Sequence, residues 1–399
     1  AKGLPESLLG DIQLHSVLDI DLDGDGKLDL VSGSYTNGRL AVRLNQGDGT
    51  FGDAIYYDSL DASEGCLSTA DFNGDGLLDV VVAGSRQTGK FSLHLSNGDG
   101  TLAPASQHQF TDTGGRPISI VGADITGDGV PDVSVLDNYQ RKLVVLKYDR
   151  VADEFTQHFV HTFNEQPQGV SAVDVDGDHD LDLVVHSFIE GDANKSIQVF
   201  ANDGEGDFSL LSSITDLVYP SYLAFGDIDL DGDQDFVANV VAGDKLTYVY
   251  LNDGSGVFAT TQNIPLHEGQ RNNVELTDIN SDGWVDLIVV QGDTSRIAVH
   301  INDQGVFEPL LDLSAGGIPT PIESGDIDGD GDVDVIVGHI SGGSDNIHVF
   351  TNLLGEINQS TSRTFDVKVN PVNDPPTLDS LADVTIDEDS PEKTVNLAG

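Results

Sequence analysis

The string Asp21-Leu-Asp-Gly-Asp-Gly-Lys-Leu-Asp29 is the first of seven copies of an acidic nonapeptide, and this repeat decides the fold. The later copies begin at Asp71, Asp124, Asp174, Asp227, Asp278 and Asp326, so successive starts lie 48 to 53 residues apart. Internal periods of this length are typical of repeat architectures. One period has room for four short strands and their turns. We call the copies acidic loops 1 to 7 and number their positions 1 to 9.

The residues between the acidic loops have the pattern of β-strands. An apolar run follows each loop, as at 78–83 and 285–290, and an alternating run such as 246–251 comes next. A turn rich in Gly, Asn and Asp then leads to a Phe or Leu, as at 45–51 and 252–258. Because no stretch keeps a 3.6-residue period, we expect almost no helix.

Seven such units must bury their faces against one another. A closed ring does this without the atypical capping repeats that an open stack requires. The sequence therefore predicts an all-β fold, a seven-bladed β-propeller with four-stranded antiparallel blades. The segment Lys2-Gly3-Leu4-Pro5 is similar to the Gly-x-Phe/Leu that opens the fourth strand elsewhere, so we expect it to supply the outer strand of blade seven. Residues 361–369 are the alternative occupant of that place.

The composition of the chain argues against several classes of function. The chain has 399 residues with 68 acidic and 18 basic side chains, and its formal net charge is −50. A chain this acidic repels nucleic acid and anionic lipid. No apolar run is long enough to span a membrane. Cys66 is the single cysteine, which excludes a disulfide framework and paired-cysteine metal or redox sites. We therefore expect neither a nucleic-acid partner nor direct membrane insertion.

The acidic loops, with the strings Leu-Asp-Leu-Val-Val and Leu-Asn-x-Gly-x-Gly-x-Phe, resemble FG-GAP/VCBS repeats. The resemblance covers residues 1–357. It implies an integrin-α-like calcium-binding β-propeller of a kind found in many secreted bacterial proteins. It also implies a secreted or cell-surface location, and by itself it implies no activity.

The end of the chain has a different pattern. Residues 365–376 resemble the junction between tandem cadherin-like or Ig-like modules of bacterial surface proteins, and residues 384–390 resemble the opening strand of such a module. We therefore expect the propeller at 1–357, a linker at 358–376 and the truncated start of a module at 377–399. Further domains of the same polypeptide are expected to follow.

The acidic loops are candidate calcium sites, because Ca²⁺ takes six to eight oxygen ligands and flexible loops with alternating carboxylates supply them. We assign the side chains at positions 1, 3, 5 and 9 and the main-chain carbonyl at position 7 as ligands, for up to seven Ca²⁺. An EF-hand is excluded because the glutamate at position 12 is missing and the flanks are strands. Magnesium suits the loops less well, because it keeps more of its waters. The alternative is seven solvated turns without an ion.

The assigned ligands of loops 1 to 4 are Asp21, Asp23, Asp25, Lys27 and Asp29; Asp71, Asn73, Asp75, Leu77 and Asp79; Asp124, Thr126, Asp128, Val130 and Asp132; and Asp174, Asp176, Asp178, Asp180 and Asp182. Those of loops 5 to 7 are Asp227, Asp229, Asp231, Asp233 and Asp235; Asp278, Asn280, Asp282, Trp284 and Asp286; and Asp326, Asp328, Asp330, Asp332 and Asp334. Loop 3 has only a threonine hydroxyl at position 3, so we expect it to bind most weakly. Loop 4 departs from the pattern at position 6, where His179 replaces glycine.

The regularity of the seven repeats favours a binding function over a catalytic one. We expect a calcium-stabilised adhesion module that recognises a glycan or an extracellular protein, and we assign no catalytic residue. One alternative is a polysaccharide lyase or glycosidase, which would need a distinctive catalytic insertion in one blade. The other is a structural spacer in an extracellular filament.

The resemblance implies that the connections from second to third strand lie on the face opposite the acidic loops, and a series of basic residues marks this face as the candidate ligand face. A base stands at the expected start of the third strand in six repeats, at Arg39, Lys90, Lys142, Lys195, Lys245 and Arg296. Arg86, Arg116, Arg141 and Arg271 fall in the same or neighbouring connections, and Tyr35, Tyr139 and Tyr222 lie beside them. This basic rim suits a carboxylated or sulfated glycan or an acidic peptide. The alternative is that each base pairs with a nearby acid and only stiffens a turn.

Overall fold

The computed structural model divides the chain into two compact units, Ala1–Asn352 and Leu353–Gly399. The structure describes residues 2–3, 14–34, 39–59, 66–84, 89–110, 115–188, 195–215, 217, 220–240, 246–265, 272–315, 318–339 and 347–352. The expected linker and the expected C-terminal module lie outside the described residues, as does the segment 361–369.

The first unit consists of seven four-stranded antiparallel sheets, so the predicted seven-bladed β-propeller is confirmed. Blade 1 comprises β2 (Leu14–Ile20), β3 (Asp29–Ser34), β4 (Arg39–Arg43) and β5 (Ile55–Asp58). Blade 2 comprises β6 (Leu67–Ala70), β7 (Asp79–Ala83), β8 (Lys90–His94) and β9 (Ser106–Gln109). Blade 3 comprises β10 (Pro117–Ala123), β11 (Asp132–Asp137), β12 (Lys142–Asp149) and β13 (Glu154–Thr162). Blade 4 comprises β14 (Pro167–Val173), β15 (Asp182–Phe188), β16 (Lys195–Asn202) and β17 (Phe208–Ile214).

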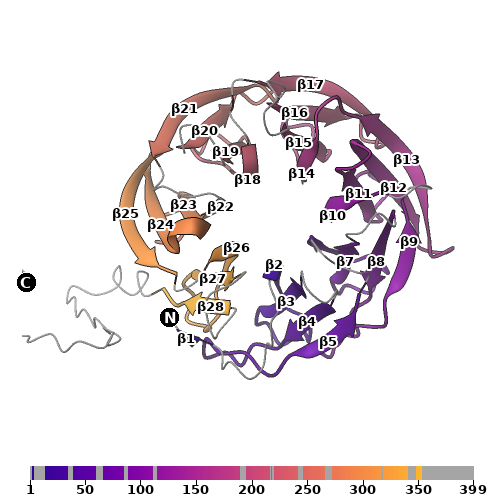
Figure 1. The fold of residues 1–399 in the computed structure, drawn as a ribbon, viewed down its shortest axis with the longest axis horizontal. Helices are drawn as coiled ribbons and strands as arrows, with labels where there is room; N and C mark the ends of the chain where they lie inside the picture. Colours follow the sequence, from indigo (N-terminus) through magenta and orange to yellow (C-terminus); the bar gives the residue numbers. More distant parts are fainter. Residues whose placement is uncertain are drawn as a thin grey trace, which may run out of the picture. The chain divides into compact units, whose positions relative to one another are not determined.

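Blade 5 comprises β18 (Pro220–Gly226), β19 (Asp235–Val240), β20 (Leu246–Asn252) and β21 (Phe258–Pro265). Blade 6 comprises β22 (Asn272–Thr277), β23 (Asp286–Gln291), β24 (Arg296–Asp303) and β25 (Val306–Ser314). Blade 7 comprises β26 (Pro319–Gly325), β27 (Asp334–His339), β28 (Ile347–Phe350) and β1 (Lys2–Gly3). The first strand of each blade lies nearest the central opening and the fourth lies at the periphery (Figure 1).

The ring closes through its first strand. β1 pairs antiparallel with β28, with Lys2 opposite Val349 and Gly3 opposite His348. The N-terminal segment therefore supplies the outer strand of blade 7, as the sequence predicts.

The hydrophobic core lies between the blades. Every residue of β7, β11, β19, β23 and β27 is buried, because both faces of these second strands contact neighbouring sheets. At the junction of blades 7 and 1, Leu30 and Phe51 pack against Ile327 and Ile336. This packing matches the buried-type runs in the sequence.

Helix is almost absent, as expected. The one helical segment in the described part of the chain is the 3₁₀ turn η2 (Gly292–Thr294). No helix among the described residues is long and apolar enough to cross a membrane.

Candidate metal centres and the basic rim

The acidic loops connect the first and second strands of all seven blades, as Asp21–Asp29 does between β2 and β3. In each blade the first strand runs into the loop and the antiparallel second strand leaves it. All seven loops therefore lie on one face of the ring, and the third strands begin at the other face.

The carboxylate at position 1 closes each loop. Asp21 Oδ1 accepts a hydrogen bond from the Gly24 N–H at 2.8 Å, and its Oδ2 accepts one from the Gly26 N–H at 3.0 Å. Gly26 has a φ of +85°, and His179 adopts the same left-handed conformation in loop 4 with a φ of +76°. Loop 4 therefore keeps the common geometry although a side chain there costs about 1 kcal/mol.

The aspartate at position 9 is buried in every loop and anchors it to the sheet. Asp235 is 0% exposed, its Oδ2 accepts the Ile228 N–H at 2.8 Å, and its Oδ1 accepts the Asn252 N–H at 2.7 Å. Equivalent pairs of bonds form in the other six loops. Burial raises the pKa of this carboxyl to about 6 in Asp79, Asp182, Asp235 and Asp286, although the hydrogen bonds lower it.

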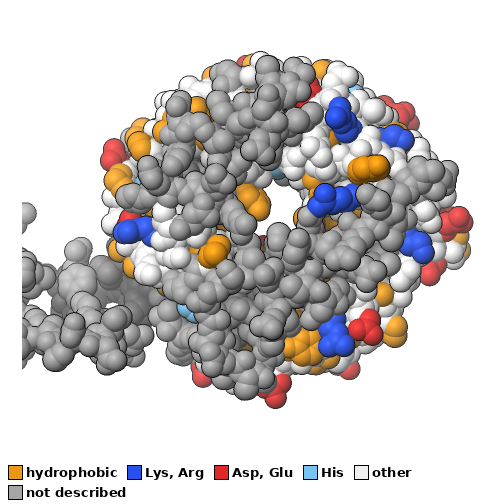
Figure 2. Space-filling model, viewed as in Figure 1, with side chains coloured by type: hydrophobic (Ala, Val, Ile, Leu, Met, Phe, Trp, Pro, Cys, Tyr) orange, Lys and Arg blue, Asp and Glu red, His pale blue; other side chains and the backbone are white. Residues whose placement is uncertain are grey.

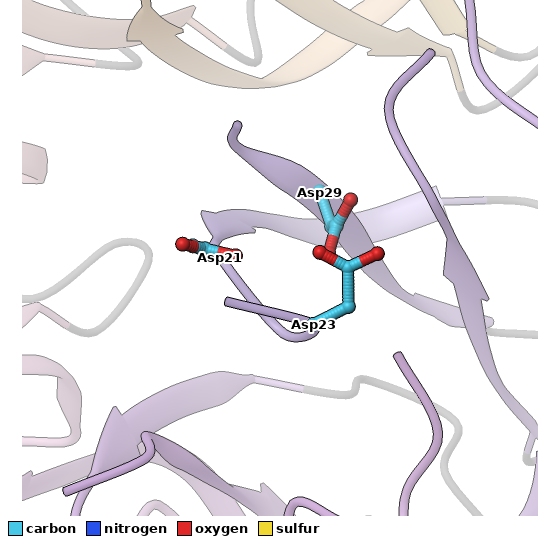
Figure 3. Close-up of side chains that lie close together, drawn as sticks. All are labelled: Asp21, Asp23 and Asp29. Carbon is cyan, nitrogen blue, oxygen red and sulfur yellow. The ribbon is translucent and has the colours of Figure 1, made fainter. Parts of the chain in front are cut away.

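Positions 1, 3 and 9 come together as a carboxylate cluster. Their oxygens lie within 4.8 Å of one another in loops 1, 4, 5 and 7, and Figure 3 shows the cluster of Asp21, Asp23 and Asp29. In loops 2, 3 and 6 the residue at position 3 is Asn73, Thr126 or Asn280. The acids at position 5 are not part of these clusters. The structure thus brings together three of the four predicted side-chain positions.

These clusters fit a hard cation. Oδ1 of Asp176 and Oδ1 of Asp229 are shielded from solvent and have no hydrogen-bond partner among the described residues. Burial raises the pKa of both carboxyls, and the neighbouring aspartates raise it further. A cation bound by oxygen ligands would satisfy these shielded atoms and offset the repulsion. At position 7, Leu77, Val130 and Trp284 have only a main-chain oxygen to offer.

In two of the acidic loops a lysine side chain contacts the aspartate at position 5. Lys147 Nζ lies 2.9 Å from Asp128 Oδ2 in loop 3, and Lys27 contacts Asp25 in loop 1. A cation at loop 3 must therefore compete with Lys147. This contact adds a reason to expect the weakest binding there.

Each acidic loop is also bonded to the next blade, through the main-chain carbonyl at position 2. Asn302 Nδ2 of blade 6 donates to Ile228 O of loop 5 at 2.8 Å, and Asn45 Nδ2 of blade 1 donates to Ile327 O of loop 7 at 2.9 Å. In blade 3 the donor is Arg150 Nε, 2.8 Å from Phe72 O. In the remaining four loops the donors are the Gly100 N–H and the side chains of Asn202, Asn252 and Asn352. Their acceptors are the carbonyl oxygens of Leu22, Ile125, Val175 and Ile279, in that order. Five of the seven donors are asparagines, and two of these, Asn45 and Asn252, belong to the Leu-Asn string of the repeat.

Comparison with known proteins agrees with this architecture. The FG-GAP-like repeat family matches residues 21–82, 71–135 and 278–337, which include loops 1, 2, 3, 6 and 7. The chain contains FG-GAP-like repeats. No curated protein matches the sequence.

Several solved structures share the fold of this seven-bladed ring. BBS1N, from its complex with ARL6DN, has a TM-score of 0.60 at 12% identity over 84% of this chain and 91% of that one. A lectin from Agrocybe aegerita that recognises non-reducing terminal N-acetylglucosamine has a TM-score of 0.53 at 21% identity over 76% of this chain and 81% of that one. Sqt1 of Saccharomyces cerevisiae has a TM-score of 0.57 at 11% identity, covering 84% of both chains. At these identities the likeness concerns the fold alone.

The described bases that begin the third strands lie on the face opposite the acidic loops. Arg39, Lys90, Lys142, Lys195 and Arg296 are the first residues of β4, β8, β12, β16 and β24. Figure 2 shows a face with Lys and Arg side chains mostly on the right half of the ring and acidic side chains mostly at its outer margin. All seven acidic loops are described, so their carboxylates would be drawn in red if they lay on this side. Few acidic side chains are seen within the ring, so this is the face away from the acidic loops.

Two bases of the rim pair with acids of the outer strand in the same blade. Arg296 Nε lies 2.7 Å from Asp312 Oδ1, and Arg39 Nε lies 3.5 Å from Asp58 Oδ1. Arg141 Nη1 donates to Asn164 O at 2.7 Å. Tyr139 is 65% exposed and Tyr222 is 39% exposed. Arg86, Lys245, Arg271, Tyr35 and the side chain of Lys195 lie outside the described residues.

Proposed function

We propose that this ring is a calcium-stabilised binding module without catalytic activity. The observation that carries the proposal is the carboxylate cluster at positions 1, 3 and 9, which includes shielded oxygens without a hydrogen-bond partner. Up to seven Ca²⁺ ions would be held by these side chains, with position 5 and the position 7 carbonyl completing the ligand set. Seven Ca²⁺ ions would add 14 positive charges to a chain whose formal net charge is −50.

Calcium would act on the whole ring because each loop bonds to the next blade. Ordering loop 5, for example, fixes the Ile228 carbonyl that Asn302 of blade 6 binds. Without an ion, the clustered carboxylates repel one another and the loop loses that order. The ions are therefore expected to rigidify the ring at its seven inter-blade junctions.

The partner is proposed to bind the face opposite the calcium loops, where the basic rim lies. A glycan or extracellular protein with acidic groups suits this surface, because arginine and lysine pair with carboxylate and sulfate. Strong acidity and dependence on calcium suit a secreted or cell-surface location. The N-acetylglucosamine-binding lectin shows that a ring of this fold is used for recognition in another protein.

A panel of sulfated, carboxylated and neutral glycans and of acidic peptides, probed in saturating calcium, tests this function. Lys90→Ala with Lys142→Ala should weaken binding of an acidic ligand at least tenfold. Lys27→Ala with Lys147→Ala removes the same charge on the calcium face and should leave binding unchanged. Cleavage of a polysaccharide would establish the enzymatic alternative, and no binding across the panel would favour a structural spacer.

A further inference from the structure

A cavity of about 250 Å³ lies between blades 5 and 6, away from the acidic loops. Its wall on the blade 5 side is Pro265, the last residue of β21. Blade 6 supplies the rest, with Gln291 from β23, Ala298 and His300 from β24, and the segment 309–312 of β25. Nothing in the metal clusters or in the basic rim accounts for this cavity.

Deep in the cavity lie polar side chains. Gln291 is 1% exposed and His300 is 7% exposed, and the His300 Nδ1 has no hydrogen-bond partner among the described residues. Burial lowers the pKa of His300, although the nearby Asp312 raises it, so the imidazole is neutral at pH 7. A neutral imidazole offers one donor and one acceptor. The floor is therefore able to hydrogen bond a hydroxyl group.

The mouth of the cavity is apolar. Leu310 is 52% exposed, and Pro265 and Pro309 line the cavity with it. Leu311 pairs with Val299, which packs on the other face of the sheet, so its side chain is directed away from the cavity. An exposed leucine and two prolines beside buried polar groups suit a ligand with an apolar body and a polar tip. Exposed apolar side chains that lie together mark interaction sites more often than single exposed apolar side chains do.

The charges around the cavity select a neutral tip. The Asp312 carboxylate is already bonded to the Arg296 guanidinium at 2.7 Å. Arg296 would repel a cationic ligand and Asp312 would repel an anionic one. Because these two side chains neutralise each other, neither is left to pair with a charged ligand. Among the described lining residues none is an aromatic of the kind on which sugar rings stack, so a sugar is less well matched.

We propose that this cavity receives a tyrosine side chain of a peptide partner, with the phenol ring against Leu310 and the two prolines and the hydroxyl at His300. Tyrosine combines a rigid apolar body with a neutral hydrogen-bonding tip, and ordering it costs little conformational entropy. The proposal deepens the proposed binding function by naming a partner class. It does not depend on the acidity of the ligand at the basic rim.

The test is a titration of the calcium-loaded chain with N-acetyl-L-tyrosinamide, followed by the NMR signals of labelled histidine. The His300 signals should shift, and N-acetyl-L-phenylalaninamide should bind about fivefold more weakly because it lacks the hydroxyl. Leu310→Asp should abolish the binding. Leu210→Asp is the matched control, because Leu210 is 54% exposed on β17 of blade 4, and it should change nothing.

A second variant tests the role of the His300 imidazole. His300→Phe should make the two probes bind equally, and the fold accepts phenylalanine there because Phe200 occupies the equivalent place in blade 4 with 1% exposure. Equal affinity of both probes for the unmodified chain, an unaffected Leu310→Asp variant, or binding of methyl glucoside in place of the tyrosine probe would each overturn the proposal. These outcomes leave the glycan and peptide panel unaffected, so failure here is distinguishable from failure of the binding function.

Discussion

The aspartate at position 9 has a structural role that is separate from any metal. Both oxygens of Asp235 accept main-chain N–H groups, one from the loop and one from the end of β20. Hydrogen bonds from buried N–H groups to a charged acceptor are among the stronger ones in proteins. These two bonds therefore contribute to holding the loop on the sheet in addition to any bond to an ion.

Asp235→Asn should lower the free energy of unfolding by about 1–3 kcal/mol, because an amide NH₂ group replaces one acceptor opposite a buried N–H. Urea denaturation in excess chelator measures this without a metal contribution. Asp207→Asn, which removes the same charge at an exposed turn, should change stability by less than about 0.5 kcal/mol. Equal losses in the two variants would contradict the anchoring role.

A partly buried glutamate on an inner strand gives the fold a pH dependence. Burial raises the pKa of Glu275 on β22 to about 7, although Ser324, whose Oγ lies 3.3 Å from Glu275 Oε1, lowers it. Between its ordinary pKa and pH 7 the folded state holds the proton longer than the unfolded state does. Stability therefore falls as the pH rises through this range.

Glu275→Gln should raise the melting temperature at pH 8 and change it little at pH 5. The gain at pH 8 is expected to be about 1–3 kcal/mol, since one pKa unit corresponds to about 1.4 kcal/mol. Thermal melts at both pH values measure the difference, with the exposed Glu154→Gln as control. A gain of the same size at both pH values would show that the carboxyl does not titrate in this range.

Among the elements, the strands and acidic loops were predictable because their signals are local. Alternation, apolar runs and the nonapeptide identified seven similar units, and the first residues even indicated the closing strand. The bonds between blades could not be predicted, because Asn45 and Ile327 are 282 positions apart in sequence. In blade 3 the donor is Arg150, which no repeat pattern marks. The acids that pair with Arg39 and Arg296 could not be predicted either, because they depend on the register between the third and fourth strands.

Removing residues 1–10 should destabilise the ring strongly, because β28 would lose its outer neighbour β1 and blade 7 would present an open edge. Removing residues 377–399 should leave the calorimetric transition of the ring nearly intact. Differential scanning calorimetry of both truncations compares them directly. Equal tolerance of the two deletions would refute the closing role of β1.

At the scale of the whole molecule, the acidic loops and the inter-blade bonds form one continuous system. Every loop holds a buried aspartate that is bonded to its own third strand, and every loop bonds through position 2 to the next blade. An ion that orders one loop therefore stabilises a junction, and seven ions would stabilise the closed ring. The basic rim and the tyrosine cavity depend on that closure because they are built from strands of separate sheets.

Thermal unfolding with and without calcium tests this account most directly. Ligand linkage gives about 2.7 kcal/mol per site at a hundredfold excess over Kd, so several sites together should shift the melting temperature steeply. We predict a large fall in excess chelator, full recovery on adding calcium, and no recovery with magnesium. A melting temperature that is unchanged in excess chelator would contradict the proposal that calcium holds the ring together.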